Sequence, residues 1–102
     1  MSVKNLTSGN FDEIVKSGKA VIDFHAEWCN PCKIISPIVH KVAEKMKDVK
    51  FGKVDVDKEG ELAQRFQVMS VPTLLFFSDG RQVDRIVGIL SEEELIKRIK
   101  KI

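Results

Sequence analysis

Apolar residues along the chain fall into two kinds of pattern that alternate with each other. Short apolar runs, typical of strands, occur at residues 3–6, 20–26, 51–56, 73–77 and 82–87. Apolar residues at helical spacing lie between and after these runs, at residues 11–18, 31–47, 57–66 and 91–102. The order implies two crossover connections and a closing hairpin, and it predicts an α/β fold with a mixed central sheet of about five strands flanked by about four helices.

Polar residues at the ends of these segments predict how some of them begin and turn. Ser91 and Glu94 have the spacing of a capping box, and Asn10 and Glu13 repeat that spacing before the first helix. Asp79-Gly80 separates the last two apolar runs. Because both residue types tolerate positive φ, we predict a tight β-hairpin there.

One acidic residue interrupts the most apolar strand. The run at residues 20–26 is apolar almost throughout, which indicates a central strand buried on both faces. Asp23 lies in its middle, where a carboxylate is costly unless it is neutral or paired. Burial should therefore raise the pKa of Asp23. The alternative is a surface position on a strand in a different register.

The segment that follows this strand, Trp28-Cys29-Asn30-Pro31-Cys32-Lys33, contains both cysteines of the chain. A strand leads into it and a helical pattern leads out, so Cys29 is expected at the start of a helix. Free backbone N–H groups and the helix dipole stabilise an anion there, which favours a reactive Cys29 thiolate. Pro31 suits the first helical turn, where its missing N–H costs nothing.

Three interpretations of the cysteine pair can be compared. In a redox pair, Cys29 attacks a disulfide and Cys32 then attacks Cys29 to release the reduced substrate. A zinc site needs four ligands, yet the chain has no second C-x-x-C, and its histidines are His25 and His40, the latter about two helical turns beyond Cys32. An inert structural bridge would close a very small loop and would restrict the unfolded chain little. We favour the redox pair and predict no metal.

Length and composition predict a single folded domain and a location in the cell. The 102 residues suffice for one domain, predicted over residues 1–102, with 43% hydrophobic and 31% charged residues as in folded soluble proteins. No apolar run is long enough for a membrane span, and the first residues lack a signal-peptide core, so we expect a cytoplasmic protein without membrane contact. In a reducing compartment, a C-x-x-C pair is typical of catalysis or metal binding.

The net charge of +2 points to no particular partner. The basic cluster near the C-terminus could indicate an acidic partner or nucleic acid: Lys97, Arg98, Lys100 and Lys101. Cations at the end of a helix also complement its dipole, and we favour this second interpretation. We therefore expect no nucleic-acid partner.

The cysteine motif resembles that of the thioredoxins. Trp28-Cys29-Asn30-Pro31-Cys32-Lys33 follows Val21-Ile22-Asp23-Phe24, and Val71-Pro72-Thr73 resembles the second signature of the family. The resemblance covers essentially the whole chain. It has two departures, because thioredoxins usually carry Gly at the position of Asn30 and often an aromatic residue at that of His25.

This resemblance implies the thioredoxin fold and a protein disulfide reductase, that is, a thiol–disulfide oxidoreductase acting in electron transport and cell redox homeostasis. It implies no bound cofactor beyond the Cys29–Cys32 disulfide. It also implies a monomer that receives electrons from a reductase of the thioredoxin-reductase type and passes them to oxidised proteins. Two rival functions stay open: a disulfide oxidase or isomerase, if Asn30 raises the redox potential, and a non-catalytic binding module on the same fold.

The resemblance also implies roles for residues around the cysteines. In the family, the residue matching Asp23 lies behind the second cysteine, so Asp23 is expected to be the base for Cys32. Lys53 matches a neighbouring lysine that tunes this acid, although most lysines are simply solvated. His25 is either a proton donor near the site or a packed residue at a strand end.

A substrate-binding surface is expected beside the thiols. The resemblance implies a cis Val71-Pro72 bond against the dithiol, where an extended substrate could pair with the backbone of Val71. The residues expected to bind substrate are Trp28, Asn30, Pro31, Val71, Pro72, Gly88 and Ile89. Val56 and Met69 would add to the apolar rim around them. The alternative for Trp28 is core packing.

Overall fold

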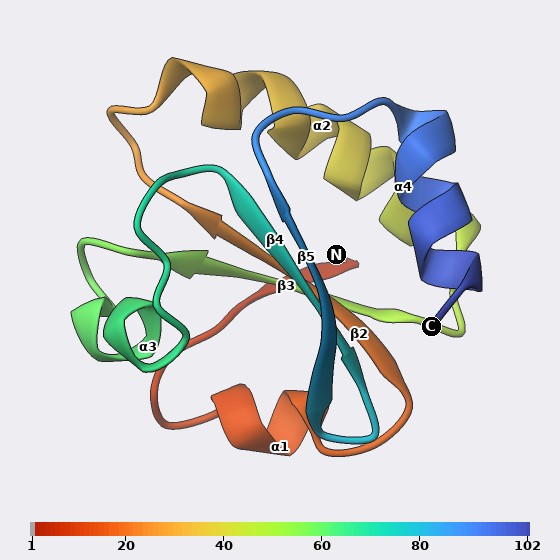
Figure 1. Ribbon diagram of the computed structural model, residues 1–102, viewed down its shortest axis with the longest axis horizontal. Coiled ribbons are helices and arrows are strands. Elements are labelled where there is room, and N and C mark those ends of the chain that lie inside the picture. Colours follow the sequence, from red (N-terminus) through yellow and green to blue (C-terminus); the bar gives the residue numbers. More distant parts are fainter. Residues whose placement is uncertain (1) are drawn as a thin grey trace.

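Alternating strand and helix patterns produce a layered α/β arrangement in the computed structural model, which describes residues 2–102 (Figure 1). In chain order the elements are β1 (Val3–Asn5), α1 (Phe11–Val15), β2 (Lys19–His25), α2 (Asn30–Lys45), β3 (Lys50–Asp55), α3 (Gly60–Arg65), β4 (Thr73–Ser78), β5 (Arg81–Val87) and α4 (Glu92–Lys100). The predicted mixed sheet flanked by helices is therefore confirmed.

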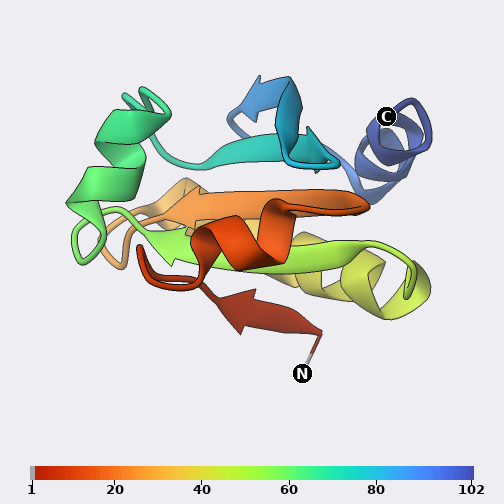
Figure 2. The ribbon, with the colours of Figure 1, turned by 90° about the horizontal axis from the view of Figure 1, so that it is seen from below.

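The sheet has the strand order β1-β3-β2-β4-β5, with β2 at its centre (Figure 2). β2 pairs in parallel with β3, which pairs in parallel with β1. β4 is antiparallel to β2, and β5 is antiparallel to β4 at the edge. Asp79 and Gly80 have φ values of 49° and 87° and connect the last two strands, as the hairpin prediction required.

Helices cover both faces of this sheet, α2 and α4 on one face and α1 and α3 on the other (Figure 1). Val21 of β2 packs in the same apolar cluster as residues of α2 and α4. Ile22 and Phe24 of β2 point to the other face and pack in a second apolar cluster, together with residues of α1 and α3. Because side chains alternate along a strand, Asp23 and His25 share the face of Val21, which is covered by α2.

Local side-chain hydrogen bonds overturn one cap prediction. The Ser91–Glu94 capping box is present at the start of α4. The equivalent box at α1 is absent, because Asn10 Oδ1 accepts a hydrogen bond from the backbone N–H of Thr7 at 2.8 Å. Glu13 instead pairs with Lys16 at 2.8 Å.

The start of α3 also differs from the prediction. The helix begins at Gly60 rather than near residue 57. Asp55 Oδ1 accepts hydrogen bonds from the backbone N–H groups of Asp57 and Lys58, at 2.9 and 3.3 Å. This Asx-type turn uses the residues that the apolar pattern had assigned to the first turn of the helix. Within residues 2–102, no helix has the length and apolar character needed to cross a membrane.

Candidate active site

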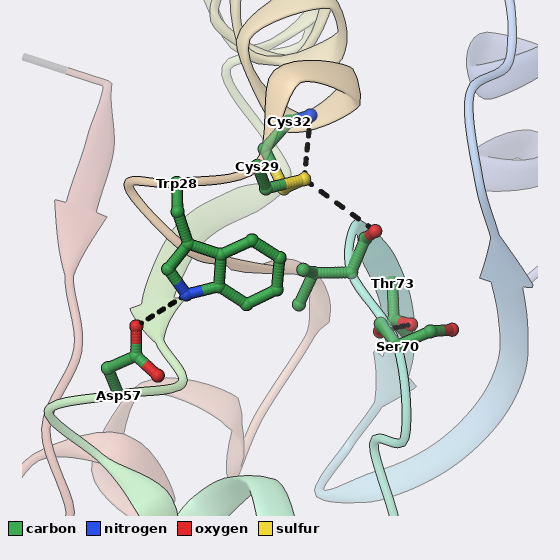
Figure 3. Close-up of a disulfide and its surroundings, with 7 residues drawn as sticks. Trp28, Cys29, Cys32, Asp57, Ser70 and Thr73 are labelled. Carbon is green, nitrogen blue, oxygen red and sulfur yellow. Dashed lines mark hydrogen bonds between the residues drawn. A yellow bond between two sulfur atoms is a disulfide. The ribbon is translucent and has the colours of Figure 1, made fainter.

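The two cysteines form a disulfide at the junction of β2 and α2 (Figure 3). Cys29 is the N-cap residue of α2, and its Sγ accepts a hydrogen bond from the backbone N–H of Cys32 at 3.1 Å. A sulfur here occupies the place of the oxygen in an ordinary N-cap side chain. Reduction of the disulfide would leave a Cys29 thiolate next to this N–H and to the positive end of the helix dipole.

The surroundings of the two sulfurs differ more than their burial does. Cys29 and Cys32 are 4% and 5% exposed, so accessibility of the oxidised pair does not separate their roles. Cys29 Sγ lies 3.6 Å from the carbonyl oxygen of Val71, in the loop before β4 (Figure 3). Cys32 instead lines a cavity that Asp23 also lines. Cys29 is therefore next to the loop before β4, whereas Cys32 shares a cavity with a buried acid.

Asp23 is buried without a protein hydrogen bond to one of its oxygens. The residue is 4% exposed, and within residues 2–102 its Oδ1 has no hydrogen-bond partner. Burial raises the pKa of Asp23 to about 7, and the positive charge of Lys53, opposite it in the β2–β3 register, counteracts part of this rise. The predicted burial and raised pKa of Asp23 are both confirmed. A group with this pKa can accept and release a proton near neutral pH.

The cavity that joins Asp23 to Cys32 measures about 150 Å³. It is lined by Asp23, His25, Ala26, Glu27, Cys32, Lys33, Ser36 and Lys53. This volume is large enough for water molecules, which need polar partners such as these. Water in this cavity can carry a proton between Asp23 and Cys32.

Trp28 lies at the surface beside the disulfide, not in the core. Its side chain is 69% exposed, which excludes the core-packing alternative. The indole Nε1–H donates a hydrogen bond to Asp57 Oδ2 at 2.9 Å and so fixes the ring next to Cys29 (Figure 3). Sequence reasoning missed Asp57, since an acid in a turn carries no signal of a partner 29 residues away.

An apolar hollow of about 90 Å³ adjoins this tryptophan. Its lining comes from three separate segments: Trp28, Val56, Val68, Met69, Ser70 and Val71. Met69 is 91% exposed, so the rim of the hollow is open to solvent. The structure thus brings together three residues predicted for the apolar rim, Trp28, Val56 and Met69. Val71, predicted to pair with substrate through its backbone, lines the same hollow.

Two hydrogen bonds hold the loop before β4, which lies beside Cys29. The Val71-Pro72 bond is cis, as expected. The Thr73 hydroxyl donates to the carbonyl oxygen of Ser70 at 2.7 Å. The N–H of Gly88 donates to the carbonyl oxygen of Pro72 at 2.9 Å. Gly88 has φ +100°, a region that other residues rarely adopt, and a Cβ there would meet nothing within 4 Å.

The remaining predicted residues border this surface. Ile89 follows Gly88 and is half-exposed. Asn30 and Pro31 are exposed in the first turn of α2, next to Cys29. Within residues 2–102, no group of three or more His, Cys, Asp or Glu side chains is placed to hold a metal ion.

Comparisons with known proteins agree with this geometry. Residues 2–101 match a family model described as Thioredoxin. A thioredoxin of Chlamydia pneumoniae is 40% identical over 99 residues, which cover 97% of each chain. A thioredoxin of Staphylococcus saprophyticus is 42% identical over 103 residues, covering 99% of this chain and 98% of the relative. The structure of a mutant thioredoxin from Halobacterium salinarum aligns with a TM-score of 0.93 at 33% identity, covering 98% of this chain and 89% of that one.

Proposed function

The chain belongs to the thioredoxin family, and from this premise we propose that Cys29 attacks, Cys32 resolves and Asp23 serves Cys32 as a base. The protein is a thiol–disulfide oxidoreductase with a redox-active Cys29–Cys32 pair and a disulfide reductase role. One observation carries the proposed division of roles. The Cys29 sulfur caps the helix beside a surface loop, whereas Cys32 borders the cavity of Asp23.

The first half of the reaction takes place at Cys29. Its thiolate attacks one sulfur of a substrate disulfide, a new S–S bond forms to Cys29, and the other substrate sulfur leaves as a thiolate. The N–H of Cys32, 3.1 Å from Cys29 Sγ, and the dipole of α2 stabilise the attacking thiolate. Charge-assisted hydrogen bonds of this kind are stronger than neutral ones.

The second half takes place at Cys32. Asp23 accepts the thiol proton of Cys32 through the cavity, and the resulting thiolate attacks Cys29 Sγ. The Cys29–Cys32 disulfide forms, the bond from Cys29 to the substrate breaks, and the second substrate sulfur leaves reduced. Two electrons have then moved from the protein to the substrate. Lys53 moderates the rise in the pKa of Asp23, so its charge tunes this step.

No bound cofactor takes part, since thioredoxins work through their active-site disulfide. Membership of the family implies a reductase that supplies electrons and protein substrates that receive them. We also propose that the electron donor is of the thioredoxin-reductase type, and that the protein is a cytoplasmic monomer with a single domain over residues 1–102. Met1 lies outside the described residues.

The redox potential tests the reductase role against the oxidase or isomerase alternative. Asn30, where thioredoxins usually carry Gly, is the residue that favours the alternative. It is the first residue of α2 and is exposed beside Cys29. In glutathione mixtures we expect the pair to equilibrate near the potential of thioredoxins, about −270 mV. A value above about −180 mV would support the alternative, and Asn30→Gly would show whether Asn30 causes the rise.

We propose that the loop at Val71 pairs with the backbone of the substrate. The carbonyl oxygen of Val71 lies 3.6 Å from Cys29 Sγ, so a peptide linked to Cys29 passes within reach of it. An extended peptide can add to exposed backbone groups as a strand, whatever its sequence. Trp28, Met69 and Ile89 then offer apolar surface to its side chains, and the missing side chain of Gly88 leaves room for close approach.

A disulfide-linked peptide complex of Cys32→Ser tests this docking. We expect a crystal structure to show a backbone hydrogen bond between the peptide and Val71. Methylating the peptide nitrogen that donates this bond should slow attack on the peptide disulfide by about fivefold, since one such bond contributes about 1 kcal/mol. Methylation two residues further from the disulfide is the control. Equal rates for the two peptides, or a peptide without backbone bonds to Val71, would rule the docking out.

A further inference from the structure

His25 lines both the cavity at Asp23 and a second cavity beside it. It is the last residue of β2 and shares the α2-facing side of that strand with Asp23, two residues earlier. Together with Asp23 and Cys32 it lines the cavity of about 150 Å³. It also lines an adjoining surface cavity of about 290 Å³, which Asp23 and Cys32 do not line. His25 is half-buried between the two.

The proposed role of Asp23 creates a need for such a residue. Asp23 can accept the proton of Cys32 only as a carboxylate, so any proton that it already carries must first reach solvent. Asp23 is only 4% exposed, so its direct exchange of protons with bulk water is restricted. A second group at the mouth of the cavity would therefore speed the exchange.

The other side chains that line this cavity are less suited to the task. Lys33 and Lys53 are ammonium groups, which donate hydrogen bonds but have no acceptor site. Glu27 lines both cavities as well, but an ionised carboxylate only accepts hydrogen bonds. Ser36 carries a hydroxyl, which does not ionise near neutral pH. A neutral imidazole accepts at one nitrogen and donates at the other, and it changes charge close to pH 7.

We propose that His25 relays the proton between Asp23 and solvent, an inference that rests on the proposed role of Asp23 as base. Before each resolution step, the proton on Asp23 passes through cavity water to the free imidazole nitrogen of His25, which leaves Asp23 able to accept the proton of Cys32. The imidazolium then releases the proton from its solvent-facing nitrogen to bulk water. Asp23 ends as a carboxylate and His25 as neutral imidazole, so one proton leaves for each Cys32 thiol consumed.

The charges around His25 suit this relay. Burial lowers the pKa of His25, and Asp55, its register partner on β3, raises it in part. Lys53 on β3 lowers the pKa further, Glu27 raises it and Lys58 lowers it, while Asp23 and Lys33 complete the ionisable groups on the Asp23 side. His25 is consequently neutral at pH 7 and has a nitrogen free to accept a proton.

Single-turnover kinetics test the relay. Reduced protein is mixed with an aromatic disulfide whose thiol product is coloured. Release of the first equivalent of coloured thiol reports attack by Cys29, and release of the second reports resolution by Cys32. In dilute buffer between pH 6 and pH 7, we expect His25→Gln and His25→Phe to slow the second release about fivefold and to leave the first unchanged. The difference should close above pH 8, where Asp23 is already ionised. His40→Gln is the control, since His40 lines neither cavity.

Rescue separates proton transfer from packing. Added imidazole should restore the second release in His25→Ala, whereas the same concentration of a buffer too large for the cavity should not. The relay is wrong if His25→Gln matches the wild type at every pH. It is also wrong if the variants are slowed equally from pH 5 to pH 9 without rescue, or if His25→Phe alone keeps the wild-type rate, since these results indicate packing.

The Asp23→Asn variant distinguishes failure of the relay from failure of the base. If Asp23→Asn slows the second release and His25→Gln does not, the role of Asp23 as base is supported and the relay through His25 is wrong. If Asp23→Asn has no effect, the base role itself fails, and the relay with it. We expect the double variant to be no slower than Asp23→Asn within about twofold, because the relay acts only through Asp23.

Discussion

The Cys29→Ser variant is expected to lose turnover of a disulfide-bonded protein substrate by roughly a thousandfold or more, because the nucleophile is gone. A serine hydroxyl at the N-cap of α2 still accepts the N–H of Cys32, so the fold should be retained. Cys32, next to the buried Asp23, faces the cavity rather than the Val71 loop and cannot take over. Turnover is measured with a thiol reductant, and circular dichroism confirms folding.

Cys32→Ser should behave differently, although it also stops turnover. Cys29 remains at the helix N-terminus and still attacks, but nothing resolves the mixed disulfide. We therefore expect substrate proteins to stay linked to Cys29 and to be released by reductant. The double Cys29→Ser, Cys32→Ser variant is the control and should trap nothing. Equal trapping by the two single variants would contradict the assignment of roles.

Asp23→Asn is expected to slow the resolution step by about a hundredfold at pH 7, with little effect on the initial attack. The amide has nearly the shape of the carboxyl group but cannot accept the proton of Cys32. In the wild type, resolution should accelerate as pH rises through about 7, the pKa of Asp23, and this dependence should be absent from the variant. An unchanged pH profile in Asp23→Asn would show that another group is the base.

The same substitution should alter stability in a pH-dependent way. The folded protein holds the Asp23 proton up to about pH 7, whereas the unfolded chain releases it near the ordinary value of 3.8. The wild type is therefore not penalised at low pH. It loses stability as pH rises from about 4 to about 7, and the loss then levels off. The shift corresponds to about 4 kcal/mol, so Asp23→Asn should gain that much relative to the wild type between pH 4 and pH 8.

Denaturant unfolding at several pH values measures this gain. Asp48→Asn is a matched control, since Asp48 is exposed and the same substitution there removes no buried carboxyl group. If wild type and Asp23→Asn had parallel stability profiles, the buried carboxyl group would have to be compensated in the folded state. That result would remove the physical basis for its action as a base.

The sequence pattern predicted those parts of the site that depend on local chemistry. An acid inside an apolar strand indicated the burial of Asp23, and a C-x-x-C after that strand placed Cys29 at a helix start. The Asp79-Gly80 turn was equally readable, because positive φ restricts which residues can occupy it. In each case the sequence signal lies in residues that are close together in the chain.

The hydrogen-bond partners of individual side chains, and the cavities between elements, could not be predicted in the same way. Nothing in the spacing of Asn10 shows that its side chain turns back to Thr7 rather than forward to the helix. The extra residue in β5, opposite the step from Phe76 to Phe77, follows from fitting a twisted edge strand. The bond from Trp28 to Asp57 and the cavity shared by Asp23 and His25 exist only once β2, β3 and α2 have packed.

Mass mapping of the reduced protein tests the central claim most directly. The protein is exposed briefly to a limiting amount of alkylating reagent at pH 7, digested and analysed for the modified cysteine. Our account predicts that Cys29 carries nearly all of the label, because its thiolate is stabilised at the start of α2, while Cys32 stays a protonated thiol facing Asp23. Labelling of Cys32 first, or of both cysteines at the same rate, would contradict it.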